Sequence, residues 1–247
     1  MASRDNPLLD KLRAGTPATG CWQFTPSPDV AEILSLCGFD ALLVDHEHGP
    51  GALESLLGIL RAAGRNGTSV LVRVPWNDAV YLKRVLDLGV DGVMVPMLED
   101  AAQARAAVAA CRYPPQGKRG AAWSVVRASR YGLEADYAAQ AWERLLLIGQ
   151  VESLAAVERL PEIAAVDGLD LLLIGPLDLS CSVGYPGELD HPEVRAAVAR
   201  AEAAILAAGK WLGGVARSVD EALAMRDRGY HLVLPTSDLH LLRDGGR

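Results

Sequence analysis

The sequence has few of the features that would place the chain in a membrane, in a disulfide-rich class or on nucleic acid. Its four cysteines lie far apart with no C-x-x-C pair, so we predict reduced core or near-core thiols, neither a disulfide framework nor a zinc site. No apolar run approaches the roughly 20 residues that span a bilayer, so no membrane association is expected. The formal net charge of −7 argues against nucleic-acid binding. Residues 1–15 lack the apolar stretch of a signal peptide, which favours a cytoplasmic protein.

Lysine is also scarce, and this scarcity limits the chemistry. The chain has only Lys11, Lys83, Lys118 and Lys210, which fall in expected helices, in a loop or just before a strand. An enzyme that forms a Schiff base with a carbonyl substrate needs a lysine inside its active site. The sequence therefore disfavours that mechanism.

Apolar runs of strand length are, by contrast, abundant. Eight of them alternate with amphipathic segments, and they are apolar on both faces, as the strands of a helix-covered parallel sheet are. Such alternation within about 250 residues is typical of a (β/α)8 TIM barrel. We therefore predict an α/β fold with one TIM-barrel domain over residues 1–247, preceded by a short extra helix in residues 6–15. The runs begin at Thr19, Ala41, Ser69, Asp91, Leu145, Leu169, Trp211 and His231.

Start and stop signals place individual helices and two unusually long connections. One helix is expected after a Ser27 cap, and another from Asn77 to Gly89. Residues 112–144 and 176–190 are too long for plain crossovers. Long loops at the carboxyl ends of barrel strands are usually functional, so we expect function there. Any helix after the last strand must be short.

Polar side chains gather where the expected strands end. His48 follows the second strand in "LLVDHEHGP", Arg73 ends the third, Glu152 follows the fifth and Asp178 follows the sixth. The carboxyl ends of barrel strands face one common mouth, so these four side chains are expected to converge. Two carboxylates without a cysteine beside them suit Mg²⁺ or Mn²⁺, with Co²⁺ or Zn²⁺ as alternatives.

The pair His46 and His48 also raises a zinc-hydrolase alternative. The other histidines lie before a helix, at a strand start and in the C-terminal tail, so none joins the pair at a strand's carboxyl end. We expect the strand to end at Asp45 and the following loop to direct one histidine to the mouth. The zinc alternative is therefore disfavoured on ligand count.

Taken together, these motifs resemble the HpcH/HpaI aldolase family, the metal-dependent class II pyruvate aldolases. The resemblance runs in family order over nearly the whole chain. It implies a carbon–carbon lyase that reversibly cleaves a 4-hydroxy-2-oxo acid to pyruvate and an aldehyde through a metal-bound pyruvate enolate. It also implies a homohexamer built as a dimer of trimers. The matching segments are "VDHEHGP", "VRVPWND", "LDLGVDGVMVPM", "RYPPQGKRG", "QVES", "IGPLDLS" and "HPEV".

The resemblance implies a role for each residue at the strand ends. Glu152 and Asp178 correspond to the metal ligands. Arg73 corresponds to the group that contacts the keto, later enolate, oxygen of pyruvate. His48 corresponds to the base that moves the proton together with a metal-bound water.

Two further assignments follow from the same resemblance. The segment Gly175–Pro176–Leu177–Asp178 is expected to bind the pyruvate carboxylate through the main-chain N–H groups of Leu177 and Asp178, since proline has none. Asp87 corresponds to an aspartate that the family pairs with the histidine. Asp87 ends a helix that leads into the fourth strand, so it is expected at the opposite end of its own barrel. It could reach a mouth only in a neighbouring subunit.

The sequence departs from the family pattern at three places: His46, Leu177 and the tail after "LPTSD", which is short for the exchanged C-terminal helix of the family. His46 occupies a position that varies among relatives, and we interpret it as a supporting or filler residue of the loop. Leu177 is bulkier than the alanine of the family motif, so it should narrow the aldehyde side of the pocket. Candidate acceptor-side residues are Trp22, Arg127 and Tyr131.

Two other functions stay open at this point. One is an acyl-CoA lyase of the malyl-CoA or citryl-CoA type, which would need a basic surface for the CoA phosphates that this acidic chain offers poorly. The other is a non-catalytic barrel that binds a keto acid.

Overall fold

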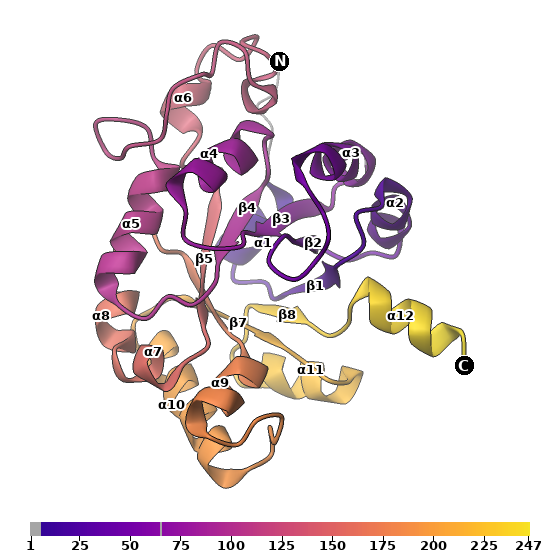
Figure 1. Cartoon of the computed structure of the whole chain (residues 1–247), viewed down its shortest axis with the longest axis vertical. Coiled ribbons are helices and arrows are strands. Elements are labelled where there is room, and N and C mark those ends of the chain that lie inside the picture. Colours follow the sequence, from indigo (N-terminus) through magenta and orange to yellow (C-terminus); the bar gives the residue numbers. More distant parts are fainter. Residues whose placement is uncertain (1–5, 65) are drawn as a thin grey trace.

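A computed structural model describes residues 6–64 and 66–247 (Figure 1). Its strands are all parallel and form a closed barrel in chain order, with β8 paired to β1. The predicted (β/α)8 barrel is confirmed, and each expected apolar run holds one strand. The strands are β1 (Ala18–Gln23), β2 (Ala41–Asp45), β3 (Ser69–Arg73), β4 (Gly92–Val95), β5 (Leu146–Val151), β6 (Leu171–Ile174), β7 (Trp211–Val215) and β8 (Leu232–Leu234).

Helices follow the strands and cover the outside of the barrel (Figure 1). The helix after β8 has only eight residues, as expected, and it projects away from the barrel. The helices are α1 (Pro7–Arg13), α2 (Pro28–Leu36), α3 (Leu53–Ala63), α4 (Ala79–Asp87), α5 (Ala101–Cys111), α6 (Tyr137–Gln140), α7 (Leu154–Glu158), α8 (Leu160–Ala164), α9 (Pro176–Val183), α10 (Pro192–Ala207), α11 (Val219–Asp227) and α12 (Asp238–Gly245), with a 3-10 turn η1 (Arg127–Ser129).

Strand side chains alternate between two buried layers. In β2, Leu43 belongs to the layer inside the barrel, whereas Leu42 and Val44 belong to the layer between strands and helices. In β3, Leu71 points inside and Val70 points outside. This period of two fixes which polar side chain at the end of a strand faces the mouth.

Helix α1 closes the amino-terminal end of the barrel. Its side chains Leu8, Leu9 and Leu12 are almost fully buried and join the inner layer. The Asn6 side chain caps the helix and donates to the main-chain oxygens of Asp91, at 2.7 Å, and Arg144, at 2.8 Å. The extra helix is thus confirmed, and it leaves the opposite end as the mouth.

Three local expectations need correction. Residues 112–144 connect α5 to β5, so they lie at the amino-terminal end of the barrel, and they contain η1 and α6. Residues 176–190 begin with helix α9, because Pro176 suits the first helical turn. Helix α4 is capped by Asp78 and not by Asn77, whose side chain donates to the main-chain oxygen of Gln103.

The cysteines only partly match expectation. All four are unpaired within the described part of the chain, but only Cys21 and Cys111 are buried, whereas Cys37 and Cys181 are exposed. No helix among the described residues is long and apolar enough to cross a bilayer. Of the segment considered for a signal peptide, residues 1–5 lie outside the described part.

Candidate active site

The inner row of side chains ends in a charged pair at the mouth. Asp45 stands two residues after Leu43, and Arg73 stands two residues after Leu71, so both continue the inner face of their strands. The register pairs Asp45 directly with Arg73. Arg73 Nε lies 3.1 Å from Asp45 Oδ1, and Nη2 lies 2.5 Å from Oδ2, which makes a two-pronged ion pair.

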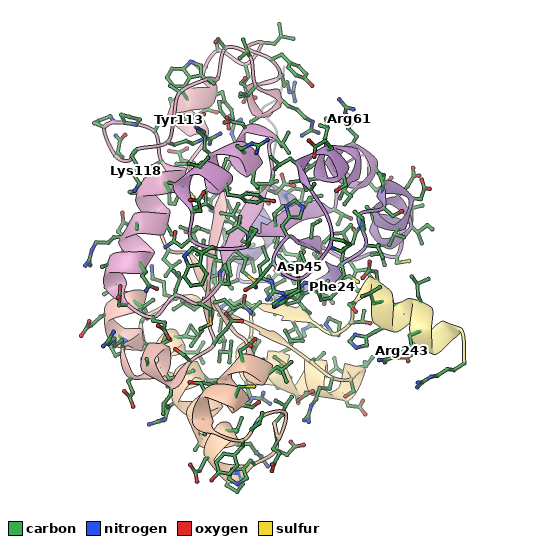
Figure 2. All side chains as sticks on the ribbon, in the orientation of Figure 1. Phe24, Asp45, Arg61, Tyr113, Lys118 and Arg243 are labelled. Carbon is green, nitrogen blue, oxygen red and sulfur yellow. The ribbon has the colours of Figure 1, made fainter. Side chains whose placement is uncertain are left out.

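Trp22 of β1 contacts both members of this ion pair. The Arg73 guanidinium lies 4.6 Å from the centre of the Trp22 ring, and Trp22 Nε1 donates to Asp45 Oδ2 at 3.2 Å. Asp45 is 1% exposed and Arg73 is 4% exposed. Figure 2 shows Asp45 near the centre of the barrel in this view, close to Phe24. The arginine therefore has one fixed orientation before any ligand binds.

Asp45 also holds the loop that follows β2. Its Oδ1 accepts hydrogen bonds from the main-chain N–H groups of Glu47, at 2.9 Å, and His48, at 3.2 Å. Burial alone would raise the pKa of Asp45, but the Arg73 guanidinium and these N–H groups together keep it below its usual value. Asp45 is thus charged and joins Arg73 to the His48 loop.

Glu47 lies between Arg73 and His48. Its Oε2 is 3.0 Å from Arg73 Nη1 and 3.9 Å from His48 Nε2. Burial raises the pKa of Glu47, although Arg73 and His48 oppose the rise. The His48 side chain is 64% exposed, so solvent or a substrate can reach its ring. The strand ends at Asp45, as expected, and the His48 side chain of the following loop is exposed to solvent.

Glu152 is a second deeply buried carboxylate of the mouth, beside Asp45. It follows the inner-facing residues Ile148 and Gln150 of β5 and is 2% exposed. Its Oε2 accepts the main-chain N–H of Met97 at 3.0 Å, and Met97 adopts φ 50°, which aims this N–H. Burial raises the pKa of Glu152 to about 7, against the Met97 hydrogen bond, and the charge of Asp178 adds to the rise.

The residues around Glu152 can accommodate a divalent cation. A Cβ on Gly175 would lie 2.9 Å from Glu152 Oε1 and 3.1 Å from Gln150 Nε2, so glycine keeps this space open. Asp178, in the first turn of α9, is close enough for its charge to act on Glu152. A cation between two such carboxylates would offset their repulsion, and oxygen donors suit a hard ion. No third His, Cys, Asp or Glu completes a cluster within residues 6–64 and 66–247, so other positions would be left for substrate and water.

The start of α9 is suited to an anion. Its N-cap is Gly175, which has no side chain to accept the first-turn N–H groups, and Pro176 occupies the first turn. The exposed Leu177 and Asp178 follow directly. These N–H groups and the positive end of the helix dipole can receive a carboxylate.

Asp87 is not brought to this mouth. It ends α4, at the amino-terminal end of the barrel, and its Oδ1 accepts from Arg119 Nη2 at 2.8 Å. Arg119 is 4% exposed, lies 4.5 Å from the centre of the Tyr113 ring and contacts the Tyr137 hydroxyl at 3.3 Å. Figure 2 places Tyr113 beyond α5, far from Asp45 in this view.

Of the three candidate acceptor-side residues, one lies at the mouth and two lie at the amino-terminal end of the barrel. Trp22 lies at the mouth, under Arg73. Arg127 donates to the main-chain oxygen of Leu88 at 2.6 Å, just after α4, and Tyr131 is exposed in the same connection. Arg127 and Tyr131 therefore do not line the mouth of their own barrel.

Two features of the site were missed by sequence reasoning. Asp45 was expected only as the end of the second strand, but it is the main partner of Arg73. Met97 had no expected role, yet its N–H holds Glu152. The period of two within β2 and β3 was a signal for the first, whereas nothing in the sequence indicated the second.

Comparisons with known proteins agree with this geometry. The family model "HpcH/HpaI aldolase/citrate lyase" matches residues 18–245. The chain is 42% identical over 238 residues to the hydroxypyruvate/pyruvate aldolase of Delftia acidovorans, covering 96% of this chain and 88% of that protein. It is 42% identical over 221 residues to the 4-hydroxy-2-oxo-heptane-1,7-dioate aldolase of Salmonella dublin, covering 90% and 83%.

A solved structure gives the same result. The crystal structure of a HpcH/HpaI aldolase/citrate lyase family protein from Burkholderia cenocepacia J2315 superposes with a TM-score of 0.94 at 36% identity, covering 98% of this chain and 96% of that one. The chain belongs to the HpcH/HpaI aldolase/citrate lyase family.

Proposed function

We propose that the chain is a divalent-metal-dependent class II aldolase that reversibly cleaves a 4-hydroxy-2-oxo acid to pyruvate and an aldehyde. The observation that supports it most is the Asp45–Arg73 pair beside the buried Glu152, at the mouth of a barrel whose relatives are aldolases. Because those relatives are named for pyruvate and 4-hydroxy-2-oxo acid substrates, the acyl-CoA lyase alternative is set aside.

Arg73 stabilises the charge that develops on the substrate. Cleavage of a β-hydroxy ketone leaves an enolate, and a preorganised cation near its oxygen lowers the barrier. Arg73 is fixed by Asp45, Glu47 and Trp22, so it needs no reorganisation when the charge appears. Its planar donors that are not engaged by these carboxylates are left for the substrate oxygen.

Glu152 and Asp178 would hold the metal, expected to be Mg²⁺ or Mn²⁺. When bound, such an ion supplies Lewis acidity and a template for the keto acid. The two carboxylates and Gly175 give it donors and space. The start of α9 then binds the pyruvate carboxylate through the N–H groups of Leu177 and Asp178.

His48 moves the proton of the substrate's 4-hydroxyl group. Its exposed ring is reachable from the mouth, and Glu47 lies 3.9 Å from Nε2. In cleavage the imidazole accepts the proton, and in aldol addition it returns it. Leu177, 58% exposed at the rim, narrows the space for the aldehyde, so we expect a small acceptor.

The wider assignments stay predictions. Asp87 is proposed to act on the His48 of a neighbouring subunit, which requires a homo-oligomer, expected to be a hexamer. Residues 1–247 are proposed to work as one barrel domain in the cytoplasm.

The test is hydrogen exchange of pyruvate in heavy water, followed by NMR of the methyl signal. Metal-stripped protein should be inactive, and added Mn²⁺ or Mg²⁺ should start the exchange. Glu152→Gln is the matched variant, because it keeps the side-chain shape while losing the charge. Exchange that is absent with every divalent ion, or that persists in EDTA, would rule out the proposed reaction.

A further inference from the structure

His46 is a buried histidine beside the active-site loop to which the reaction above gives no role. It is the first residue after β2 and is 6% exposed. Because Asp45 points inward to Arg73, His46 continues the outward row of Val44. Its main-chain N–H donates to the oxygen of Arg73 at 2.9 Å, so its backbone is fixed to β3.

The His46 ring joins this position to helix α4. Its Nδ1 lies 2.8 Å from the Tyr81 hydroxyl, and the two rings meet edge to face with centroids 6.1 Å apart. Tyr81 is itself held in the first turn of α4, since its N–H donates to Asp78 Oδ1 at 2.7 Å. The contact therefore links the end of β2 to helix α4, which follows β3 in the chain.

The loop folds back over the same ring. A Cβ on Gly51 would lie 3.4 Å from His46 Cδ2 and 3.4 Å from Nε2, so glycine lets the loop approach closely. Nε2 is buried and has no hydrogen-bond partner among the described residues. Burial lowers the pKa of His46, which keeps the ring neutral despite the nearby Asp45.

His48 has few contacts of its own to hold it. Its side chain is mostly exposed, and the ion contact to Glu47 is long, at 3.9 Å. Its position thus depends on the backbone of residues 46–52. That backbone is tied to Asp45 through the N–H groups of Glu47 and His48, and to α4 through the His46 ring.

We infer that His46 is a positioning residue: together with the Tyr81 hydroxyl, it fixes the loop that carries Glu47 and His48. This inference rests on the proposed role of His48 in proton transfer. Anchoring the loop from its outer side keeps His48 within reach of the substrate without burying its ring. A group held in reacting geometry before the substrate arrives avoids an entropic cost at the moment of reaction.

The experiment is a double-mutant cycle on the metal-loaded, full-length enzyme. Tyr81→Phe removes only the hydroxyl, and His46→Phe removes the ring nitrogens while keeping an aromatic side chain. Each should lower kcat by about fivefold to tenfold, the usual value of one hydrogen bond. KM for the keto acid and the Mn²⁺ dissociation constant should not change. The double variant should be no slower than either single variant, because both remove the same contact.

Two further variants separate positioning from general stability. Tyr230→Phe removes another buried hydroxyl, bonded to Glu202 at 2.7 Å, and should leave kcat unchanged. His46→Asn, whose amide can take the place of Nδ1, should keep more activity than His46→Phe. The inference is overturned if the Tyr81 and His46 variants lose thermal stability but keep full kcat, or if their effects multiply. An inactive wild-type enzyme would instead contradict the proposed function, so the two failures are distinguishable.

Discussion

The barrel holds a buried arginine at each end, and the two surroundings resemble one another closely. At the mouth, Arg73 pairs with Asp45 and lies 4.6 Å from the Trp22 ring. At the opposite end, Arg119 pairs with Asp87 and lies 4.5 Å from the Tyr113 ring. Both pairs combine a carboxylate, a guanidinium and an aromatic face.

The difference between them lies in the balance of charge. At the amino-terminal end the carboxylate of Asp87 pairs with Arg119, and the tyrosines Tyr113 and Tyr137 close the cluster. At the mouth Glu47, Glu152 and Asp178 add three carboxylates to the matched pair. Burial raises the pKa of Glu47 and of Glu152, and the charge of Asp178 adds to both rises. A charge-matched pair leaves no net charge to neutralise, whereas an excess of carboxylates around a buried site calls for a ligand of the other sign.

Removal of a mouth carboxylate should have the largest effect. We expect Glu152→Gln to abolish Mn²⁺ binding and to lower kcat about a thousandfold, because Lewis-acid stabilisation amounts to several kcal/mol. Metal titration and pyruvate exchange measure the two effects. Asp167→Asn, at a side chain that is 94% exposed, is the control and should match the wild type. A Glu152→Gln enzyme that still binds Mn²⁺ normally would contradict the assignment.

The two arginines should differ in what their replacement costs. Arg73→Lys should lower kcat about a hundredfold, since an ammonium cannot keep the planar contacts to Asp45, Glu47 and the substrate. Arg119→Lys should keep kcat within about tenfold but destabilise the fold by about 1–3 kcal/mol, because Asp87 loses its partner geometry in a buried place. Steady-state kinetics and urea unfolding compare them. Equal kinetic losses would show that the two ends do not differ in the way proposed.

Asp87 provides a test of whether the second end also serves a reaction. Asp87→Asn should lower kcat by about tenfold to a hundredfold if it supports a neighbour's histidine. Mixing Asp87→Asn with His48→Ala subunits, after dissociation and reassembly, should then restore activity, because some mouths receive both native groups. Mixed subunits that stay as inactive as the separate variants would leave Asp87 with a structural role alone.

A smaller effect should follow from the pH dependence of the Asp45 pair. The pKa of Asp45 in the folded state lies below its usual value, so the folded protein binds this proton less readily than the unfolded chain. Its stabilising contribution is therefore complete above the unfolded pKa of about 3.9 and is lost as the pH falls further. The urea midpoints of wild type and Asp45→Asn should differ most at pH 7 and converge below about pH 4. A difference that is independent of pH would contradict this.

The smallest effect is expected at Arg217, which follows β7 but turns to the outer surface. It pairs there with Asp190 at 2.9 Å and Glu221 at 3.1 Å, and its side chain is 52% exposed. Exposed ion pairs contribute little. Arg217→Ala should keep kcat and KM within about twofold, and a larger loss would extend the active site to this side of the rim.

Most of the residues that meet at the mouth could be predicted from the sequence, whereas fewer of the contacts at the amino-terminal end could. Apolar runs predicted the strands, and reading strand ends predicted Arg73 and Glu152 correctly as neighbours in the mouth, because parallel strands end together. The period of two within β2 and β3 indicates that Asp45 and Arg73 both face inward, but their direct pairing also depends on the register between the strands, which no single run of residues encodes.

The opposite end was harder to predict for a physical reason. Residues 112–144 contain aromatic and basic side chains of the kind found at active sites. However, a connection lies at the mouth only if it follows a strand, and it lies at the amino-terminal end of the barrel if it follows a helix. Cys111 ends α5, and the chain continues from there into β5. The Arg119–Asp87 pair joins that connection to the end of α4, 32 positions earlier in the chain, a contact that local patterns cannot reveal.

The closure of the barrel by α1 has a consequence for the order of events in catalysis. With Leu8, Leu9 and Leu12 filling one end, ligands can pass only through the other. In a well with a single entrance, whatever binds deepest must enter first and leave last. In the proposed reaction, pyruvate bound at Arg73 and the start of α9 would therefore stay until the aldehyde above it has departed, and product inhibition should be competitive for pyruvate and non-competitive for the aldehyde.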